Sequence, residues 1–224
     1  MSVRQVVDPA WRDTLAAAGL TDLTALLDAA APQSVARGTW TALEKPGLGG
    51  RQRWRWELET STGPAVVYVK RYARTPLGTQ FERMLRQYVR HSRAWWEFRQ
   101  SQRLAAAYIP VPDPVGVIEE QRGPLERRSV VLLGAVPGDA LDRTWRRLVA
   151  AGAPLTRGLA RHDLVRRLAR FVSAFHQSNT CHRDLYLCHI FADLDPSGQR
   201  RPEFWLIDLA RTIRPRLRRM RWLL

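Results

Sequence analysis

Hydrophobic residues alternate with polar ones in several short segments of the chain, and this period of two predicts β-strands. In residues 51–60 (RQRWRWELET), two tryptophans and a leucine fall on one face and charged residues on the other. The segment 65–70 (AVVYVK) is rich in β-branched residues and follows a Gly-Pro turn, so we expect it to be the next strand. Further strands are predicted at residues 34–44, 115–120 and 127–133. The five strands favour an antiparallel sheet, since short turns join neighbours.

A helical period replaces this alternation in the rest of the chain. A helical stretch at 79–107 follows the third strand, and we expect it in two pieces with Ser92 as the cap of the second. Two short amphipathic helices are predicted before the first strand, at 9–18 and 21–30. The second half of the chain is predicted to hold two helices, a polar loop and two short strands, at 139–150, 157–178, 179–189, 190–193 and 203–208.

These elements predict an α+β architecture with two lobes. We expect a helical extension at 1–33, a lobe with a five-stranded antiparallel sheet and one helix at 34–133, a hinge at 134–138, and a mainly helical lobe at 139–224. The last lobe is expected to be incomplete at its C-terminal end, because only 16 residues follow Asp208.

The charge of the chain is strongly positive and unevenly distributed. It has 36 Lys+Arg against 21 Asp+Glu, a formal net charge of +15. Residues 1–50 hold four basic and five acidic residues, so the whole surplus lies in residues 51–224. Such a surface attracts polyanions, which include nucleic acid, anionic lipid headgroups and phosphorylated glycans. A general preference for arginine over lysine explains why most basic residues are arginines. It does not explain why basic residues outnumber acidic ones.

Several classes of protein are excluded by the same composition. With 45% hydrophobic residues the chain is too apolar for a disordered basic tail. It has no apolar run long enough to span a bilayer and no cationic-then-apolar leader, so we expect neither a membrane helix nor a secretory signal. The two cysteines, Cys181 and Cys188, cannot form a disulfide framework and point to a reducing, cytoplasmic compartment.

Four positions carry the residue types that phosphoryl transfer from ATP requires, in the expected order. Lys70 ends a strand, Glu97 lies in the following helix, residues 182–184 (His-Arg-Asp) open a loop, and Asp208 ends a strand. A lysine paired with a glutamate holds nucleotide phosphates, one aspartate orients the acceptor hydroxyl, and another binds magnesium. Each residue alone is more often a surface ion pair, a cap or a turn residue, so the prediction depends on their order.

The segment 182–190 (HRDLYLCHI) resembles the signature of the lipopolysaccharide kinases, the Kdo and core-heptose kinases of bacteria. The resemblance covers roughly residues 35–224 and includes YVKRY, RAWWEFRQSQRL and WLIDLAR. It implies a protein-kinase-like two-lobe fold and an ATP- and Mg²⁺-dependent enzyme that phosphorylates a sugar hydroxyl of the lipopolysaccharide inner core, heptose or Kdo. It further implies peripheral contact with the cytoplasmic face of the inner membrane, where the acceptor is an anionic, lipid-linked glycan and not a nucleic acid.

The resemblance also implies roles for individual residues. Asp184 corresponds to the catalytic residue, within the catalytic tripeptide that it forms with His182 and Arg183. ATP binding is implied for Lys70 and its partner Glu97, and metal binding for Asp208.

Two features differ from ordinary protein kinases. His189 stands where those enzymes have asparagine, so it is a candidate metal ligand or a residue that orients Asp184, although magnesium prefers oxygen. Gly47 and Gly49 lie between the first two strands, where they either cover the phosphates or form a plain hairpin.

Other functions stay open from the residues alone. One is a different kinase-like phosphotransferase that acts on a small molecule or a protein. Another is an inactive kinase-like module that binds anionic lipid or nucleic acid through its arginines.

Overall fold

The computed structural model describes the chain except for residues 29–31, 44–49, 61–62, 74, 88–89 and 216–224. The chain forms two compact units. The first comprises Met1–Gln102 and Asp113–Ala135, and the second comprises Arg103–Pro112 and Val136–Leu224. Within the described ranges, no helix is long and apolar enough to cross a membrane.

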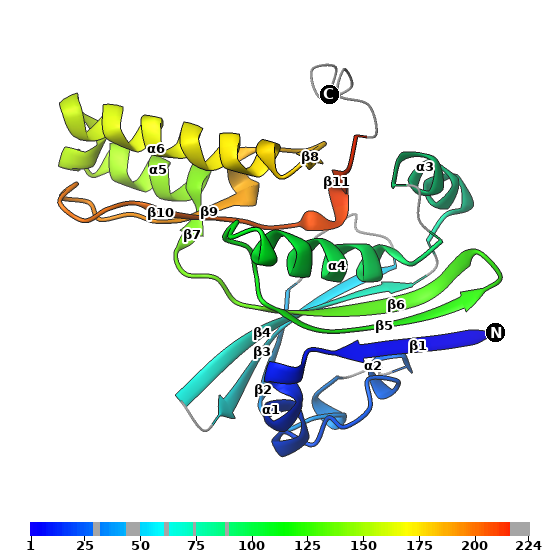
Figure 1. The fold of residues 1–224 in the computed structure, drawn as a ribbon. Coiled ribbons are helices and arrows are strands. Elements are labelled where there is room, and N and C mark those ends of the chain that lie inside the picture. Colours follow the sequence, from blue (N-terminus) through cyan, green and yellow to red (C-terminus); the bar gives the residue numbers. More distant parts are fainter. Residues whose placement is uncertain (29–31, 44–49, 61–62, 74, 88–89, 216–224) are drawn as a thin grey trace. The chain divides into compact units, whose positions relative to one another are not determined.

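The first unit is built on a six-stranded antiparallel sheet with the order β1-β5-β6-β4-β3-β2 (Figure 1). The five predicted strands are present. All six are β1 (Ser2–Val7), β2 (Thr39–Ala42), β3 (Arg51–Thr60), β4 (Gly63–Ala73), β5 (Pro114–Arg122) and β6 (Leu125–Gly134).

Strand β1 was not expected, and the prediction of a helical extension is wrong for these residues. Ser2–Val7 pairs with β5 at the edge of the sheet, from Ser2 opposite Gln121 to Val7 opposite Gly116. The helices that follow, α1 (Arg12–Ala17) and α2 (Ala25–Asp28), are shorter than predicted. A short polar edge strand acquires its hydrogen bonds only from its neighbour, so its own sequence gives a weak signal.

Two apolar clusters cover the two faces of this sheet. On one face, leucines of α1, α2 and the loop between them pack against the inward tryptophans and valines of β3 and β4. Trp56 is fully buried there, stacks on Trp40 at 4.7 Å, and donates from Nε1 to the carbonyl oxygen of Arg37 at 2.8 Å. On the other face, Trp95 and Phe98 of α4 (Arg93–Ala106) pack against β5 and β6.

Helix α4 is fixed at its start by buried polar groups of the sheet. The Oγ of Ser92 accepts from the backbone N–H of Trp95 at 3.1 Å, as the cap predicted from the sequence requires. The backbone N–H of Ser92 donates to Glu119 at 2.7 Å, and that of Arg93 donates to Glu126 at 3.1 Å. The preceding helix, α3 (Leu77–Gln87), is held to β6 by hydrogen bonds between Gln80 and the backbone of Glu126.

The second unit combines two helices with short strands. Helices α5 (Leu141–Ala150) and α6 (Gly158–Gln177) pack with a three-stranded sheet of the order β10-β9-β7. A second pair, β8 with β11, joins the segments that carry the candidate residues. The strands are β7 (Asp139–Ala140), β8 (Cys181–His182), β9 (Ile190–Asp193), β10 (Glu203–Leu206) and β11 (Thr212–Ile213).

The backbone at Gly138 needs glycine. Its φ is +77°, and a Cβ atom there would collide with the carbonyl oxygen of Ala192, where β7 pairs with β9. We expect Gly138→Ala to lower the free energy of unfolding by about 2–4 kcal/mol, from left-handed backbone strain and overpacking together. Urea denaturation measures this change.

Gly78→Ala is the matched control, because Gly78 lies in α3 and a Cβ there meets no atom within 4 Å. We expect this variant to be as stable as the wild type or slightly more stable. Equal stability of the two variants would contradict the assigned constraint at Gly138.

Candidate active site

The first group of candidate residues lies in the first unit, where β4 faces α4. The alternation along β4 places Lys70 and Tyr72 on the side that faces the helix. The Nζ of Lys70 lies 2.6 Å from Oε1 of Glu97, and Tyr72 donates from its hydroxyl to Oε2 at 3.2 Å. The Glu97 side chain is fully buried, and that of Lys70 is 15% exposed. The structure therefore brings together the lysine and glutamate that the sequence predicted as a pair.

Tyr72 was not identified from the sequence. It follows Lys70 by two residues, so strand alternation places both side chains on one face. Its ring also lies under two guanidinium groups, with Arg93 at 5.4 Å and Arg51 at 6.0 Å from the ring centroid. This spacing of two residues after the lysine could have predicted that Tyr72 lies beside the Lys70–Glu97 pair.

The second group lies in the second unit and is organised by His182. The backbone N–H of Asp184 donates to Nδ1 of His182 at 3.1 Å. Because Nδ1 accepts, Nε2 carries the proton, and it lies 3.1 Å from the carbonyl oxygen of Asp208. Burial lowers the pKa of His182 below its ordinary value of 6.5, which favours this neutral form. The imidazole thus joins the loop of Asp184 to the segment of Asp208.

His189 makes a second connection between the same segments. Its Nδ1 donates to the carbonyl oxygen of Asp184 at 2.6 Å, and its Nε2 lies 3.8 Å from Oδ2 of Asp208. Its backbone carbonyl accepts from the N–H of Ile207 at 2.9 Å. Asp208 itself has left-handed backbone angles, with φ 58° and ψ 48°. This conformation is uncommon for a residue other than glycine and persists where surrounding contacts determine it.

Asp184 forms an ion pair with Arg211 that was not predicted from the sequence. The Nη2 of Arg211 donates to Oδ1 of Asp184 at 3.2 Å, and Nε lies 2.9 Å from Oδ2. The backbone carbonyl of Arg211 also accepts from the N–H of Arg183 at 3.3 Å. Arg211 ends the WLIDLAR motif, but nothing in the local sequence distinguishes it from the many other arginines of the chain.

Asp208 has the donor chemistry for a nucleotide-bound divalent metal ion. Magnesium is held in such sites by one or two carboxylates together with phosphate oxygens and water. In the described residues, no group of three or more His, Cys, Asp or Glu side chains is placed to hold a metal alone. A single carboxylate such as Asp208 fits an ion that arrives with phosphates. The imidazole of His189 is a poor magnesium ligand, and its contacts are those of a residue that orients Asp184 and Asp208.

Gly47 and Gly49, the candidate phosphate-covering glycines, lie outside the described residues. Of the sequence-predicted residues, Lys70 and Glu97 are therefore found together in the first unit. His182, Asp184, His189 and Asp208 are found together in the second unit, with Arg183 beside them.

The fold is that of kinase-like phosphotransferases. A solved structure described as "WaaP in complex with acyl carrier protein" matches with a TM-score of 0.61 and 19% sequence identity, over 97% of this chain and 76% of that chain. The sequence matches the "Lipopolysaccharide kinase (Kdo/WaaP) family" over residues 51–223, more than half of its length. The chain therefore belongs to the lipopolysaccharide kinase family, a family of phosphotransferases, and the resemblance of segment 182–190 is confirmed. No curated protein sequence matches the chain.

The buried imidazole of His182 predicts a dependence of stability on pH. Its pKa in the folded chain lies below 6.5, so the unfolded chain binds a proton more readily and stability is lost as pH falls through 6.5. We expect the free energy of unfolding of His182→Asn to fall less than that of the wild type between about pH 7 and 5. Burial also lowers the pKa of His176, so part of the dependence remains.

The matched control is His162→Asn, at an exposed position of α6. Urea denaturation at several pH values compares the three proteins. A pH dependence of His182→Asn identical to that of the wild type and of the control would contradict the neutral, buried imidazole.

Proposed function

We propose that the protein transfers the γ-phosphoryl group of ATP to a sugar hydroxyl of the lipopolysaccharide inner core, on heptose or Kdo. The observation that carries this proposal is the arrangement of Asp184 and Asp208, which His182 and His189 hold in register, in a chain of the lipopolysaccharide kinase family. In this arrangement Asp184 can align an acceptor hydroxyl, and Asp208 can bind a metal ion that arrives with the nucleotide.

Lys70 is proposed to bind the phosphates of ATP. Its ammonium is fixed by Glu97, whose full burial keeps the ion pair away from competing water. The chain uses arginine for almost every cation, with 34 arginines and only two lysines. A lysine at this position therefore indicates a site that fits a compact ammonium group but not the wider guanidinium group. A second contact to the glutamate, from Tyr72, keeps the carboxylate oriented toward Lys70.

Asp184 is proposed to orient the acceptor hydroxyl and to accept its proton as the phosphoryl group is transferred. Its backbone is held by His182 and His189, and its carboxylate is aligned by Arg211. The Asp184 side chain is 28% exposed, so a substrate hydroxyl can reach it. The Arg211 guanidinium sets the direction of the carboxylate without removing it from solvent.

A magnesium ion would be bound by Asp208, with His189 beside the carboxylate as an orienting residue. When bound, the metal offsets the negative charge on the phosphate oxygens.

The acceptor is proposed to be a sugar, and Tyr186 supports this choice. Tyr186 is 64% exposed, and its backbone is fixed by hydrogen bonds to Asp184 and His189. An exposed aromatic ring on a rigid loop offers an apolar face to a sugar ring next to the carboxylate that receives its hydroxyl. The surplus positive charge of residues 51–224 suits an acceptor that already carries phosphate.

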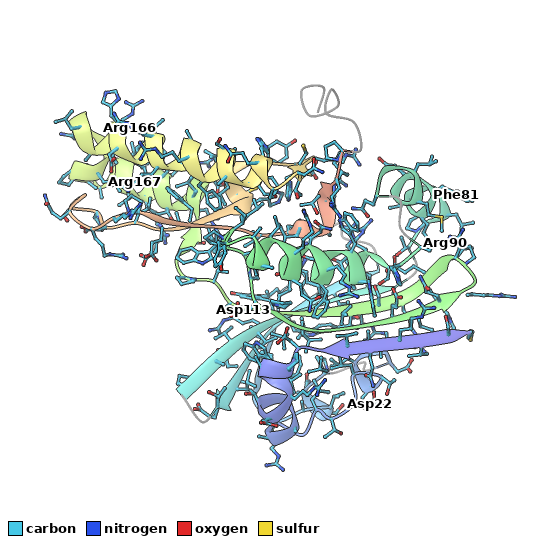
Figure 2. All side chains as sticks on the ribbon, viewed as in Figure 1. Asp22, Phe81, Arg90, Asp113, Arg166 and Arg167 are labelled. Carbon is cyan, nitrogen blue, oxygen red and sulfur yellow. The ribbon has the colours of Figure 1, made fainter. Side chains whose placement is uncertain are left out.

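Peripheral contact with an anionic membrane is proposed through α3. Leu77, Phe81 and Leu85 recur at helical spacing and are 59%, 59% and 72% exposed. Figure 2 shows Phe81 on this helix, in the same part of the first unit as Arg90. An exposed apolar stripe on a basic protein is typical of segments that lie in the membrane interface. The solved WaaP structure is described as a complex with acyl carrier protein, and an acyl carrier protein is a further partner to test.

The proposed roles predict different effects for two substitutions. We expect Asp184→Asn to lower the transfer rate by about 100- to 10,000-fold and to leave ATP binding largely intact, because the amide cannot accept the proton. Lys70→Ala is expected to weaken both ATP binding and transfer, since it also leaves the Glu97 carboxylate buried without its cation. Calorimetric ATP titration and phosphate transfer to deacylated core oligosaccharide measure the two properties.

The matched carboxylate control is Asp163→Asn on α6, which removes only a helical ion pair with Arg167 and is expected to act as the wild type. Mass spectrometry of the product identifies the phosphorylated sugar and hydroxyl. Wild-type transfer by Asp184→Asn would remove its role. Labelling of free sugars or proteins, with none on the core oligosaccharide, would overturn the proposed acceptor.

The exposed stripe of α3 predicts membrane binding that depends on apolar contact. We expect Phe81→Ser combined with Leu85→Ser to weaken co-sedimentation with phosphatidylglycerol-containing vesicles by about tenfold, because two apolar side chains no longer enter the interface. A matched control is Val165→Ser with Leu159→Ser, which removes exposed apolar residues of α6. Equal binding of both double variants and the wild type would exclude α3 as the contact.

A further inference from the structure

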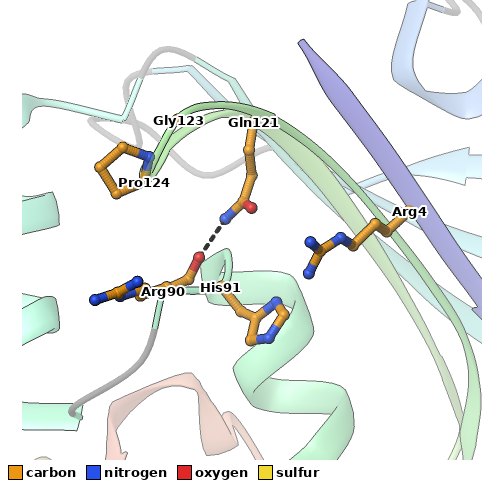
Figure 3. A pocket seen from close by; sticks show the side chains of 6 residues that line it. All are labelled: Arg4, Arg90, His91, Gln121, Gly123 and Pro124. Atoms are coloured by element: carbon orange, nitrogen blue, oxygen red, sulfur yellow. Dashed lines mark hydrogen bonds between the residues drawn. The ribbon is translucent and has the colours of Figure 1, made fainter.

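A cavity of about 690 Å³ opens in the first unit, between the N-terminal strand and the start of α4 (Figure 3). Its lining comes from β1, the loop before α4 and the turn between β5 and β6: Arg4, Arg90, His91, Gln121, Gly123 and Pro124. A cavity of this size accommodates a small organic ligand. The residues of the proposed phosphoryl transfer do not line it.

Side chains that are themselves held in place form the floor of the cavity. Gln121 is buried and donates from Nε2 to the backbone carbonyl of Arg90 at 2.5 Å. The ring of His91 stacks on Trp95 at 5.1 Å, and its Nδ1 lies 2.8 Å from the fully buried Glu119. These contacts hold residues 90–92, so the backbone position of Arg90 does not depend on a ligand.

The sheet is irregular at this place. The register between β5 and β6 shifts between Glu120 and Gln121, and Arg127 is the extra residue of β6. Such bulges bend a strand locally and often lie beside functional sites, where they redirect side chains. The turn at Gly123, with φ +59°, then forms the rim of the cavity together with Pro124.

Two exposed arginines, Arg4 and Arg90, give the cavity a positive charge. Figure 3 shows the side chain of Arg4 extending from β1 toward Gln121 and His91, while the side chain of Arg90 extends on the opposite side, below Pro124. Both residues are exposed, and among the described residues neither side chain has a carboxylate partner. The nearby carboxylate of Glu119 is fully buried and is occupied by His91 and the N–H of Ser92. The cavity therefore presents two guanidinium groups, neither of which forms an ion pair within the described residues, although Glu119 is the cross-strand partner of Arg4.

We propose that this cavity binds a phosphorylated small molecule or headgroup, with anionic groups held by Arg4 and Arg90. The planar guanidinium fork matches the geometry of phosphate oxygens and binds them through two hydrogen bonds. Arginines on opposite sides of the cavity suit a ligand with two separated anionic groups, for which Gln121 and His91 form the polar floor. This binding site is independent of the transfer chemistry and does not rest on the proposed function.

Calorimetric titration of the full chain with a hexose bisphosphate, a hexose monophosphate, inorganic phosphate and the free hexose tests this proposal. We expect the bisphosphate to bind most tightly and the free hexose not to bind. Arg4→Ala and Arg90→Ala should each weaken binding of the bisphosphate by about tenfold, and the double variant should lose it. Asp184→Asn, which lies in the second unit and leaves the Lys70–Glu97 pair intact, should bind it as the wild type does, which separates this site from the transfer chemistry.

The control for net charge is Arg161→Ala with Arg166→Ala, which removes two exposed arginines of α6 (Arg166 is labelled in Figure 2). It should bind the bisphosphate as the wild type does. Arg4→Lys with Arg90→Lys should recover part of the affinity, because the charge returns without the fork. Circular dichroism confirms that each variant is folded, as expected for exposed residues.

Vesicles of phosphatidylcholine with a minority of phosphatidic acid distinguish a lipid source of the phosphate from a soluble one. Vesicle binding that depends on Arg4 and Arg90, with no soluble sugar phosphate bound, assigns the site to a headgroup. An equal loss of affinity for the bisphosphate in the α6 control and in the cavity double variant would overturn the proposal. Failure of the wild type to bind any phosphate ligand would overturn it as well.

Discussion

The first unit depends on carboxylates that are buried between its sheet and α4. Glu97, Glu119 and Glu126 are all almost fully shielded from water, where an unpaired charge would be very costly. Each is compensated: Glu97 by Lys70 and Tyr72, and the other two by backbone N–H groups at the start of α4. The helix can therefore occupy only the position that satisfies all three. This constraint fixes Lys70 without a ligand and also holds residues 90–92, at the cavity that Arg4 and Arg90 line.

The second unit achieves the same rigidity with imidazoles. His182 and His189 each contact both the Asp184 loop and the Asp208 segment, and the β8–β11 pair adds backbone hydrogen bonds between the same segments. An imidazole has two ring nitrogens that can each form a hydrogen bond, so one histidine side chain can contact two segments at once. The histidine that replaces the asparagine of protein kinases thus has a structural explanation that does not require it to bind metal.

Much of the fold followed from local patterns, and some of the site did too. Alternation in 51–60 and 65–70 predicted β3 and β4, and Ser92 was correctly predicted as the cap of α4. Lys70 and Glu97 could be paired from their order on a strand and a helix. The partner of Asp184 could not be predicted, because Arg211 is one of 34 arginines. Only the 3-10 turn Leu209–Arg211 after Asp208 brings it to the carboxylate.

The sequence by itself determined the order of elements and the residue types of the phosphoryl-transfer chemistry, because periodicity, caps and a nine-residue motif are local properties. Tertiary structure alone decided that Ser2–Val7 is a strand, since its hydrogen bonds come from β5. It also decided that His182 and His189 contact the Asp184 and Asp208 segments and that Arg4 and Arg90 line one cavity. These features depend on groups distant along the chain, and their energies arise only when folding brings those groups within hydrogen-bonding or electrostatic range.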